Sequence, residues 1–276
     1  MDTNSVVAIA RQELTISLRS RWLIGFAAVF GVLSLAISYF GTVTAGAAGF
    51  QGFERTAASL LSLVLYLVPL LGLMLGTLSI SRDRGANELL FSQPINRADI
   101  LYGHLAGLFT AMSTAMCAGF AVAAAVILAQ LGPEGLVRFA GLVALAFVLA
   151  GVFLSIGAVC GLLSESRTRA LGVALCVWFF FVMFYDLAVI GLAFVFRERT
   201  ANVLIFVSLF GNPVDLARVS SLLTLSDPSI FGAAGAALLK VFGGLTYSYV
   251  TLALALATWL ITPVAVAVRI LKRIDL

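Results

Sequence analysis

The sequence predicts an all-α integral membrane protein with six transmembrane helices. Of its 276 residues, 62% are hydrophobic and 11% are charged, whereas soluble domains are typically about half apolar and about a quarter charged. Six apolar runs are also long enough to cross a bilayer, because about 18 such residues span roughly 30 Å of hydrocarbon as a helix. They cover residues 22–41, 57–81, 100–131, 136–163, 170–196 and 246–268. We find no soluble domain between them and expect a single transmembrane domain over residues 1–276.

The distribution of positive charge predicts how these helices are oriented. Eleven of the 17 lysines and arginines fall before the first run, in 82–99, in 164–169 and after 268, and six fall in the alternate segments. Cytoplasmic loops of membrane proteins carry the larger share of Lys and Arg. We therefore expect both termini to lie in the cytoplasm.

The residues before the first run, 4–19, predict a helix that lies in the membrane interface. Apolar side chains share one helical face and polar side chains occupy the rest, which is typical of interfacial helices. The apolar face contains Val6, Ile9, Ala10 and Leu14, and the remainder contains Arg11, Gln12 and Arg19. The alternative is a solvated tail.

The stretch "RDRGANELLFSQPINRADILYGH", residues 82–104, is polar although both of its neighbours are apolar. Gly85 allows a turn, and Pro94 ends a short helix before Asn96 caps the next one, with Asp99 at the third helical position. The short helix presents apolar side chains beside charged ones: Leu89, Leu90 and Phe91 beside Arg84 and Glu88. So short a helix has little stability alone, and its apolar side needs lipid headgroups or a groove on another protein.

The segment between the last two runs, 197–245, predicts short helices that do not cross the membrane. The apolar stretches 202–210 and 229–239 are too short to span. Asn212-Pro213 with Asp215, and Asp227-Pro228, are typical helix starts with proline at the first helical position. We expect short re-entrant helices in the outer leaflet or over the bundle. An amphipathic surface loop is the alternative.

Asp186 is the one acidic residue well inside a predicted span. A charged side chain at a helix centre costs about 2.5 to 3.5 kcal/mol on insertion scales, so such a residue is a functional candidate. Its distance from the inner end, about 24 Å at about 1.5 Å per residue, places it nearer the outer interface than the midplane. It can equally mark the point where the helix meets water or the outer helices.

Patterns of catalysis and metal binding are weak in this chain. The two lysines, Lys240 and Lys272, are not part of a phosphate-binding loop, so the chain is not an ATPase by itself. Three sulfur side chains within two helical turns, Met112, Met116 and Cys117, are weak candidates for copper(I) and are more typical of ordinary packing. The pairs Gly72/Gly76, Gly103/Gly107 and Gly157/Gly161 have the spacing that lets helices approach closely.

Three stretches resemble a known family. "ELLFSQPINRADILYG" (88–103) resembles the signature between the second and third spans of ABC-2-type permeases, the membrane halves of ATP-driven exporters, and "GNPVDLARVSSL" (211–222) resembles their element before the last span. "ISYFGTVTAGAAGFQGFERTAASLLSLVLYLVPLLGLMLG" (37–76) resembles the NosY-type permease subunits of transporters that mature nitrous oxide reductase. A departure from that family's habit is His104, where a lysine is usual, and we assign it no catalytic role.

The resemblance implies a function for the polar stretch and for two other places. It implies that residues 82–91 form a coupling helix that enters a cleft on a cytoplasmic ATPase, and that the loop 164–169 makes a second, smaller contact. The residues concerned are Arg82, Asp83, Arg84, Gly85, Glu88, Leu89, Leu90, Phe91 and Pro94, then Glu165, Arg167 and Arg169, and in the outer family motif Asn212, Pro213, Asp215 and Arg218.

The resemblance also implies the partners. It implies a homodimer in the bacterial inner membrane with two cytoplasmic ATPase subunits and a periplasmic accessory protein, in which the ATPase subunits hold ATP and Mg and this chain holds no cofactor and catalyses nothing. The task would be assembly of the copper-sulfur centres of nitrous oxide reductase. The scarcity of intramembrane charges favours a sulfur cargo or mechanical action over a copper path. A secondary carrier and a non-transporting anchor of a periplasmic assembly complex are the alternatives.

Overall fold

The computed structural model describes residues 3–45, 50–82, 96–196, 198–225 and 244–273. These residues are helical nearly throughout, and none of them forms a strand. The helices are α1 (Thr3–Leu18), α2 (Arg21–Ala45), α3 (Phe50–Arg82), α5 (Arg97–Leu163), α6 (Arg167–Phe179), the π-helix η2 (Phe180–Phe184), α7 (Tyr185–Val195), α8 (Glu198–Ser208), the 3₁₀-helix η3 (Leu209–Gly211), α9 (Pro213–Leu225) and α11 (Leu245–Arg273).

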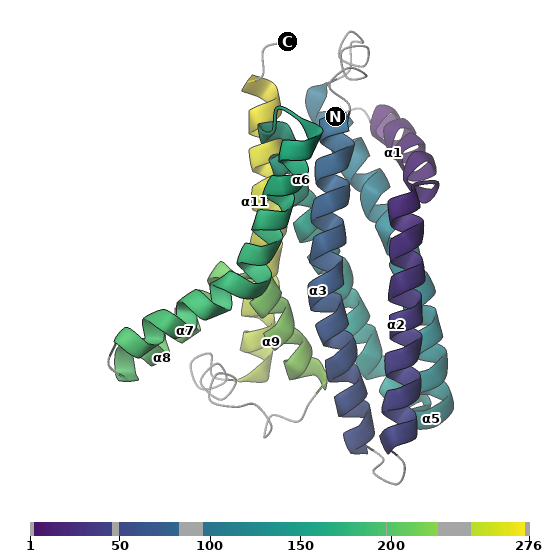
Figure 1. Ribbon diagram of the computed structural model, residues 1–276, viewed down its shortest axis with the longest axis vertical. Coiled ribbons are helices and arrows are strands. Elements are labelled where there is room, and N and C mark those ends of the chain that lie inside the picture. The colour runs from purple at the N-terminus through teal and green to yellow at the C-terminus, as the bar shows by residue number, and fades with distance from the viewer. Residues whose placement is uncertain (1–2, 46–49, 83–95, 197, 226–243, 274–276) are drawn as a thin grey trace.

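The six predicted spans are confirmed as helices long and apolar enough to cross a membrane. Within the described residues these helices cover Arg21–Gly41, Thr56–Ser81, Arg97–Ala129, Gly135–Leu163, Arg167–Val195 and Thr246–Arg273. Figure 1 shows α1, the end of α3, the start of α5 and the end of α11 at one end of the bundle. The segments that the charge distribution assigns to one side therefore lie together. That this side is cytoplasmic stays a prediction.

Helix α5 contains two spans and folds back on itself. Its helical backbone is continuous over 67 residues, yet the rings of Phe120 and Phe139 lie 5.7 Å apart between centroids, so the two halves run side by side. The reversal falls at 130–135, where the sequence has Gly132 and Pro133. Proline removes a backbone hydrogen bond and bends a helix, which explains why the chain turns here.

The glycine pairs are confirmed as places of close helix contact, and they join helices within one chain. A Cβ added at Gly76 would lie 2.4 Å from the carbonyl oxygen of Leu154, and one at Gly157 would lie 2.6 Å from that of Leu73. The Thr77 hydroxyl donates to the Gly157 carbonyl over 3.1 Å. Helices α3 and α5 thus cross almost backbone to backbone, as small residues allow in membranes.

The N-terminal helix packs on protein along part of its length. A Cβ at Gly103 of α5 would lie 2.7 Å from Cβ of Ile9, and one at Gly107 would lie 2.5 Å from the Ala10 carbonyl oxygen. The predicted apolar face of α1 therefore rests in a groove made by glycines. That α1 lies in the membrane interface stays a prediction.

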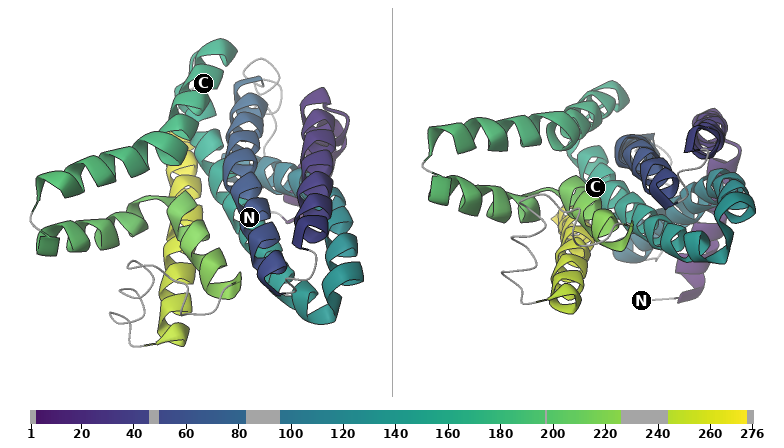
Figure 2. Two further views of the ribbon diagram at one scale, coloured as in Figure 1. Left: turned by 60° about the horizontal axis from the view of Figure 1, so that its bottom comes forward. Right: turned by 90° about the horizontal axis from the view of Figure 1, so that it is seen from below.

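Helices α7 and α8 form an arm that projects from the bundle. Figures 1 and 2 show α7 leaving the line of α6 and α8 returning beside it. Large apolar side chains on the arm are exposed, among them Leu187 and Phe194, with 63% and 86% of their surface accessible. The span predicted as one helix over 170–196 is thus made of three segments, with the π-helical turn η2 in its middle.

Candidate functional site

The outer family motif lies where the chain reverses between α8 and α9. Segments Val203–Gly211 and Pro213–Thr224 meet at an angle of 106°, which is the geometry of a broken span or of a re-entrant loop. This geometry confirms a helix start at Asn212-Pro213, because the Asn212 side-chain oxygen accepts from the Val214 N–H over 2.9 Å and Pro213 is the first residue of α9. The second predicted start, Asp227-Pro228, lies outside the described residues.

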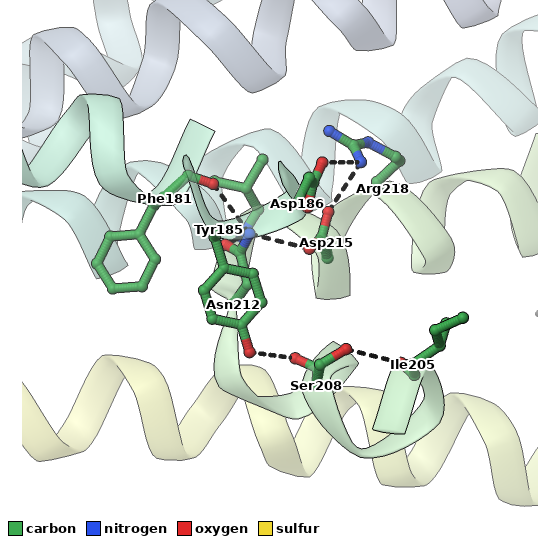
Figure 3. Close-up of polar contacts among 9 residues, drawn as sticks. Phe181, Tyr185, Asp186, Ile205, Ser208, Asn212, Asp215 and Arg218 are labelled. Carbon is green, nitrogen blue, oxygen red and sulfur yellow. Dashed lines mark hydrogen bonds and ion pairs between the residues drawn. The ribbon is translucent and has the colours of Figure 1, made fainter. Parts of the chain in front are cut away.

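Asn212 joins this corner to the π-helical turn of the fifth span. Its side chain is fully buried, and its Nδ2 donates to the Phe181 carbonyl and to Asp215 Oδ2, each over 2.9 Å (Figure 3). A π-helical turn is rare and often coincides with a functional position. All three hydrogen-bonding groups of Asn212 are used, so the residue fixes the corner against η2.

Arg218 ties α9 to α7 by bridging two carboxylates. Its Nη1 donates to Asp215 Oδ1 over 2.8 Å and to Asp186 Oδ2 over 3.0 Å (Figure 3). Asp186, the one acid inside a span, therefore meets the outer helices. The pair is about one-third exposed on each side, which keeps the energetic value of the contact modest while fixing its geometry.

Aromatic side chains complete the attachment from both neighbouring spans. The Tyr185 hydroxyl donates to the Ser208 carbonyl over 2.6 Å. From α11, Trp259 Nε1 donates to the Phe210 carbonyl over 3.0 Å and the Tyr249 hydroxyl donates to the Leu223 carbonyl over 2.6 Å. The segment from α8 to α9 is thus hydrogen-bonded to both the fifth and the sixth span.

The predicted contacts at the other end of the bundle are only partly described. Arg82 is the last residue of α3. The rest of the predicted coupling helix, Asp83 to Phe91, and Pro94 lie outside the described residues. Asn96 is confirmed as the cap of α5, since its side chain accepts from the Ala98 N–H over 3.1 Å.

The second predicted contact is an exposed loop. Glu165 and Arg169 form an ion pair one helical turn apart, and each has more than two-thirds of its side chain accessible. Arg167 begins α6 and is also exposed. Such an exposed pair adds little stability. That this loop contacts another protein stays a prediction.

The three sulfur candidates differ in burial. Met112 and Met116 are fully buried in the apolar core, whereas Cys117 is exposed. Among the described residues, no three His, Cys, Asp or Glu side chains lie together as metal ligands. Met112 and Met116 are therefore packing residues.

The structure contains a buried polar cluster near the start of α5 that the sequence analysis did not predict. Glu13 of α1 is 3% exposed, and its Oε1 accepts from the hydroxyls of Ser17 and Ser79 over 3.1 and 3.0 Å. His104 Nδ1 lies 3.2 Å from Glu13 Oε2, although the two atoms are not aligned as a hydrogen bond. The available signal was spacing, because Glu13 follows Ile9 by one helical turn and so lies on the apolar face of α1.

The surroundings of Glu13 determine its charge. Burial by itself raises the pKa of this carboxyl, but the contact with His104 and the two serine hydroxyls outweighs burial and holds the pKa below the ordinary 4.5. Glu13 is therefore ionised at neutral pH. A buried carboxylate is tolerated because it is paired and hydrogen-bonded.

Comparison with known proteins gives the same family along the whole chain. The profile of a family described as "ABC-2 family transporter protein" matches residues 7–276. A protein of Pseudomonas aeruginosa named "Probable ABC transporter permease protein NosY" is 34% identical over 276 residues, which is 97% of this chain and 98% of that protein. A protein of the same name from Stutzerimonas stutzeri is 33% identical over 278 residues, covering 98% and 99% of the two chains.

These matches agree with the architecture. Six apolar spans and a family match that runs almost from end to end make this a multi-pass protein of the bacterial inner membrane. A permease of this family works with an ATPase carried on a separate subunit. The chain belongs to the ABC-2 family of transporter proteins.

Proposed function

We propose that this chain is the permease subunit of an ATP-driven transporter that supports assembly of the copper-sulfur centres of nitrous oxide reductase. The observation that carries the proposal is its similarity, over nearly its full length, to two proteins named as probable NosY permeases. The chain itself supplies no catalytic group. Two copies assemble with two cytoplasmic ATPase subunits, which hold ATP and Mg, and with a periplasmic accessory protein.

Energy enters at residues 82–94 and at the loop 164–169. Leu89, Leu90 and Phe91 are the buried side of the coupling helix, and Arg84 and Glu88 are its polar contacts. Closure of the ATPase subunits on ATP moves the inner ends of α3 and α5. The glycine crossing supports transmission as one body, because two backbones in contact at Gly76 and Gly157 leave no compressible side chains between them.

The output appears at the outer corner. The contacts of Asn212 and Arg218 join that corner to the fifth span, and the contacts of Trp259 and Tyr249 join it to the sixth. A tilt of the spans therefore displaces the re-entrant helices and the apolar arm of α7 and α8. The exposed apolar residues of the arm are the surface on which the second copy packs. Displacement then drives a sulfur species through the dimer or acts mechanically on the periplasmic partner.

The proposal is tested by purifying the detergent-solubilised protein with whatever it retains and measuring ATP turnover. We expect a retained ATPase subunit whose turnover in the assembly falls at least about fivefold when Leu89→Ala and Glu88→Gln are combined. The matched control is Val137→Ala, since Val137 is 75% exposed at the start of the second half of α5. An assembly that neither retains an ATPase nor responds to these changes contradicts the proposal.

The two alternative functions predict different results for the purified protein, in detergent and after reconstitution into vesicles. A secondary carrier shows transport driven by an ion gradient in vesicles without any ATPase. A non-transporting anchor retains only the periplasmic partner. Copper and sulfur content of reconstituted vesicles then identifies the cargo.

A further inference from the structure

A charged cluster fastens three helices together at the inner end of the bundle. Glu13 of α1 accepts hydrogen bonds from Ser17 of its own helix and from Ser79 of α3, and it lies within ion-pair distance of His104 of α5. The carboxylate is almost fully buried and the His104 side chain is 13% exposed. A single side chain of α1 is therefore hydrogen-bonded to α3 and lies in close contact with α5.

The place of the cluster matters because α3 and α5 are consecutive spans. Ser79 lies in the last turn of α3, which ends at Arg82, and His104 lies in the second turn of α5, which starts at Arg97. The two helices that Glu13 joins are therefore those that meet the proposed coupling segment. Force applied to the inner end of either helix passes the cluster before it reaches the membrane interior.

Packing alone would leave α1 free to slide. Helix α1 packs directly against Gly103 and Gly107, which have no side chains to separate the two helices. Apolar contact of this kind is non-directional, so it does not hold α1 at one register. A buried charge does, because sliding by one residue, about 1.5 Å, would move Glu13 away from Ser79 and His104 and leave the buried carboxylate with only Ser17 of its own helix as a partner.

We propose that Glu13 and His104 are positioning residues that lock α1, α3 and α5 into one unit at the inner end, so that ATP-driven movement of α3 and α5 reaches the outer corner without slippage. This role rests on the proposed function, since the force comes from the partner ATPase. The proposed role predicts different effects on ATP-driven movement and on ATP turnover. Loss of the pair lowers the movement obtained per ATP and leaves ATP turnover itself nearly unchanged.

The test uses the complete assembly, reconstituted with its ATPase subunits, with Cys117, Cys160 and Cys176 replaced by alanine. One pair of spin labels, on cysteines at exposed positions Gln12 and Thr110, reports the distance between α1 and α5. A second pair, at exposed positions Val137 and Tyr247, neither of them on the arm, reports ATP-driven movement at the other end. ATP turnover is measured on the same preparations.

The two glutamine variants define the expected loss. For Glu13→Gln we expect turnover within about twofold of the parent, an inner distance distribution at least about twice as broad, and an ATP-driven outer shift reduced at least about threefold. We expect the same three results for His104→Gln. His104→Lys, which places a positive charge beside Glu13, should retain the narrow distribution and the full shift, a rescue that a merely space-filling role would not produce.

Three outcomes separate the possibilities. If Glu13→Gln keeps both the narrow inner distribution and the full outer shift, the locking role is wrong. If His104→Lys fails to the same degree as His104→Gln, charge is not the operative property and the proposal is likewise overturned. If the parent shows no ATP-driven shift, the proposed function fails, while the inner distance still decides whether the pair locks α1. Should Glu13→Gln not fold, Ser79→Ala and the two His104 variants give the same comparison.

Discussion

Individual side chains fix the geometry of this protein at both ends of the bundle, and Glu13 is one whose contribution depends on pH. Because its folded-state pKa is below the ordinary 4.5, its ionised form stabilises the fold above that value. This contribution disappears as the pH falls through the folded-state pKa. In Glu13→Gln the contribution is absent at every pH.

The melting temperature of the detergent-solubilised protein tests whether ionised Glu13 stabilises the fold. We expect the parent to melt above Glu13→Gln at pH 7 and the difference to narrow as the pH falls below about 4.5. Gln12→Glu, on the exposed part of α1, controls for a general effect of acid. A gap between parent and Glu13→Gln that stays constant across this range would contradict a stabilising role for ionised Glu13.

Asn212 is the corresponding residue at the outer corner. Asn212→Ala removes hydrogen bonds to Phe181, Val214 and Asp215 and leaves buried groups unpaired, for which we expect a loss of about 1–3 kcal/mol. Thr258→Val serves as control, because the Thr258 hydroxyl is exposed and bonds only to its own helix. Denaturation in detergent measures both variants. Equal stability of Asn212→Ala and the control would show that the corner does not depend on this side chain.

At the scale of helices, α3 and α5 cross this closely because the glycines at the crossing have no side chains. Gly157→Val places carbon where Leu73 backbone atoms already lie within van der Waals contact, and overpacking of this kind costs about 1–3 kcal/mol. Gly172→Ala is the matched control, since a Cβ there meets nothing within 4 Å. Alanine in a helix is favoured over glycine by about 1 kcal/mol, so this variant should be at least as stable as the parent.

The variants Gly157→Val and Gly172→Ala also test whether the crossing is needed for energy transmission as well as for stability. If α3 and α5 move as one body, Gly157→Val should reduce the ATP turnover of the assembly at least about threefold, while Gly172→Ala leaves it unchanged. Assembly of the purified permease with its ATPase subunits and a turnover assay measure this. Parent-like turnover in Gly157→Val would separate the crossing from energy transmission.

For the whole molecule, the orientation in the membrane is the prediction on which the function rests. A cysteine at Glu165, in the loop before α6, should react with a membrane-impermeant thiol reagent only after cells are opened. A cysteine at Val137 should react in intact cells with a permeable outer membrane. Both positions are exposed, and the background is free of the native cysteines. The reverse pattern would place residues 82–94 outside the cell and remove the proposed contact with an ATPase.

Much of the architecture follows from local sequence. Six apolar runs predict six spans, because the length of a helix that crosses hydrocarbon is set by the bilayer. Asn96 and the Asn212-Pro213 pair predict helix starts, because capping depends on a side chain and the backbone within three residues of it. The glycine pairs predict close approach, because spacing along a helix sets which residues share a face.

Tertiary structure decided what these local signals left open. The glycine pairs had no assigned partners until α1, α3 and α5 came together, and Asp186 had no assigned partner until Arg218 lay beside it. Glu13 resembled any charged residue of an amphipathic helix until Ser79 and His104 surrounded it. The physical reason is distance along the chain: bilayer length, capping and helical spacing act between near neighbours, whereas the pairing of buried charges depends on which remote helices pack together.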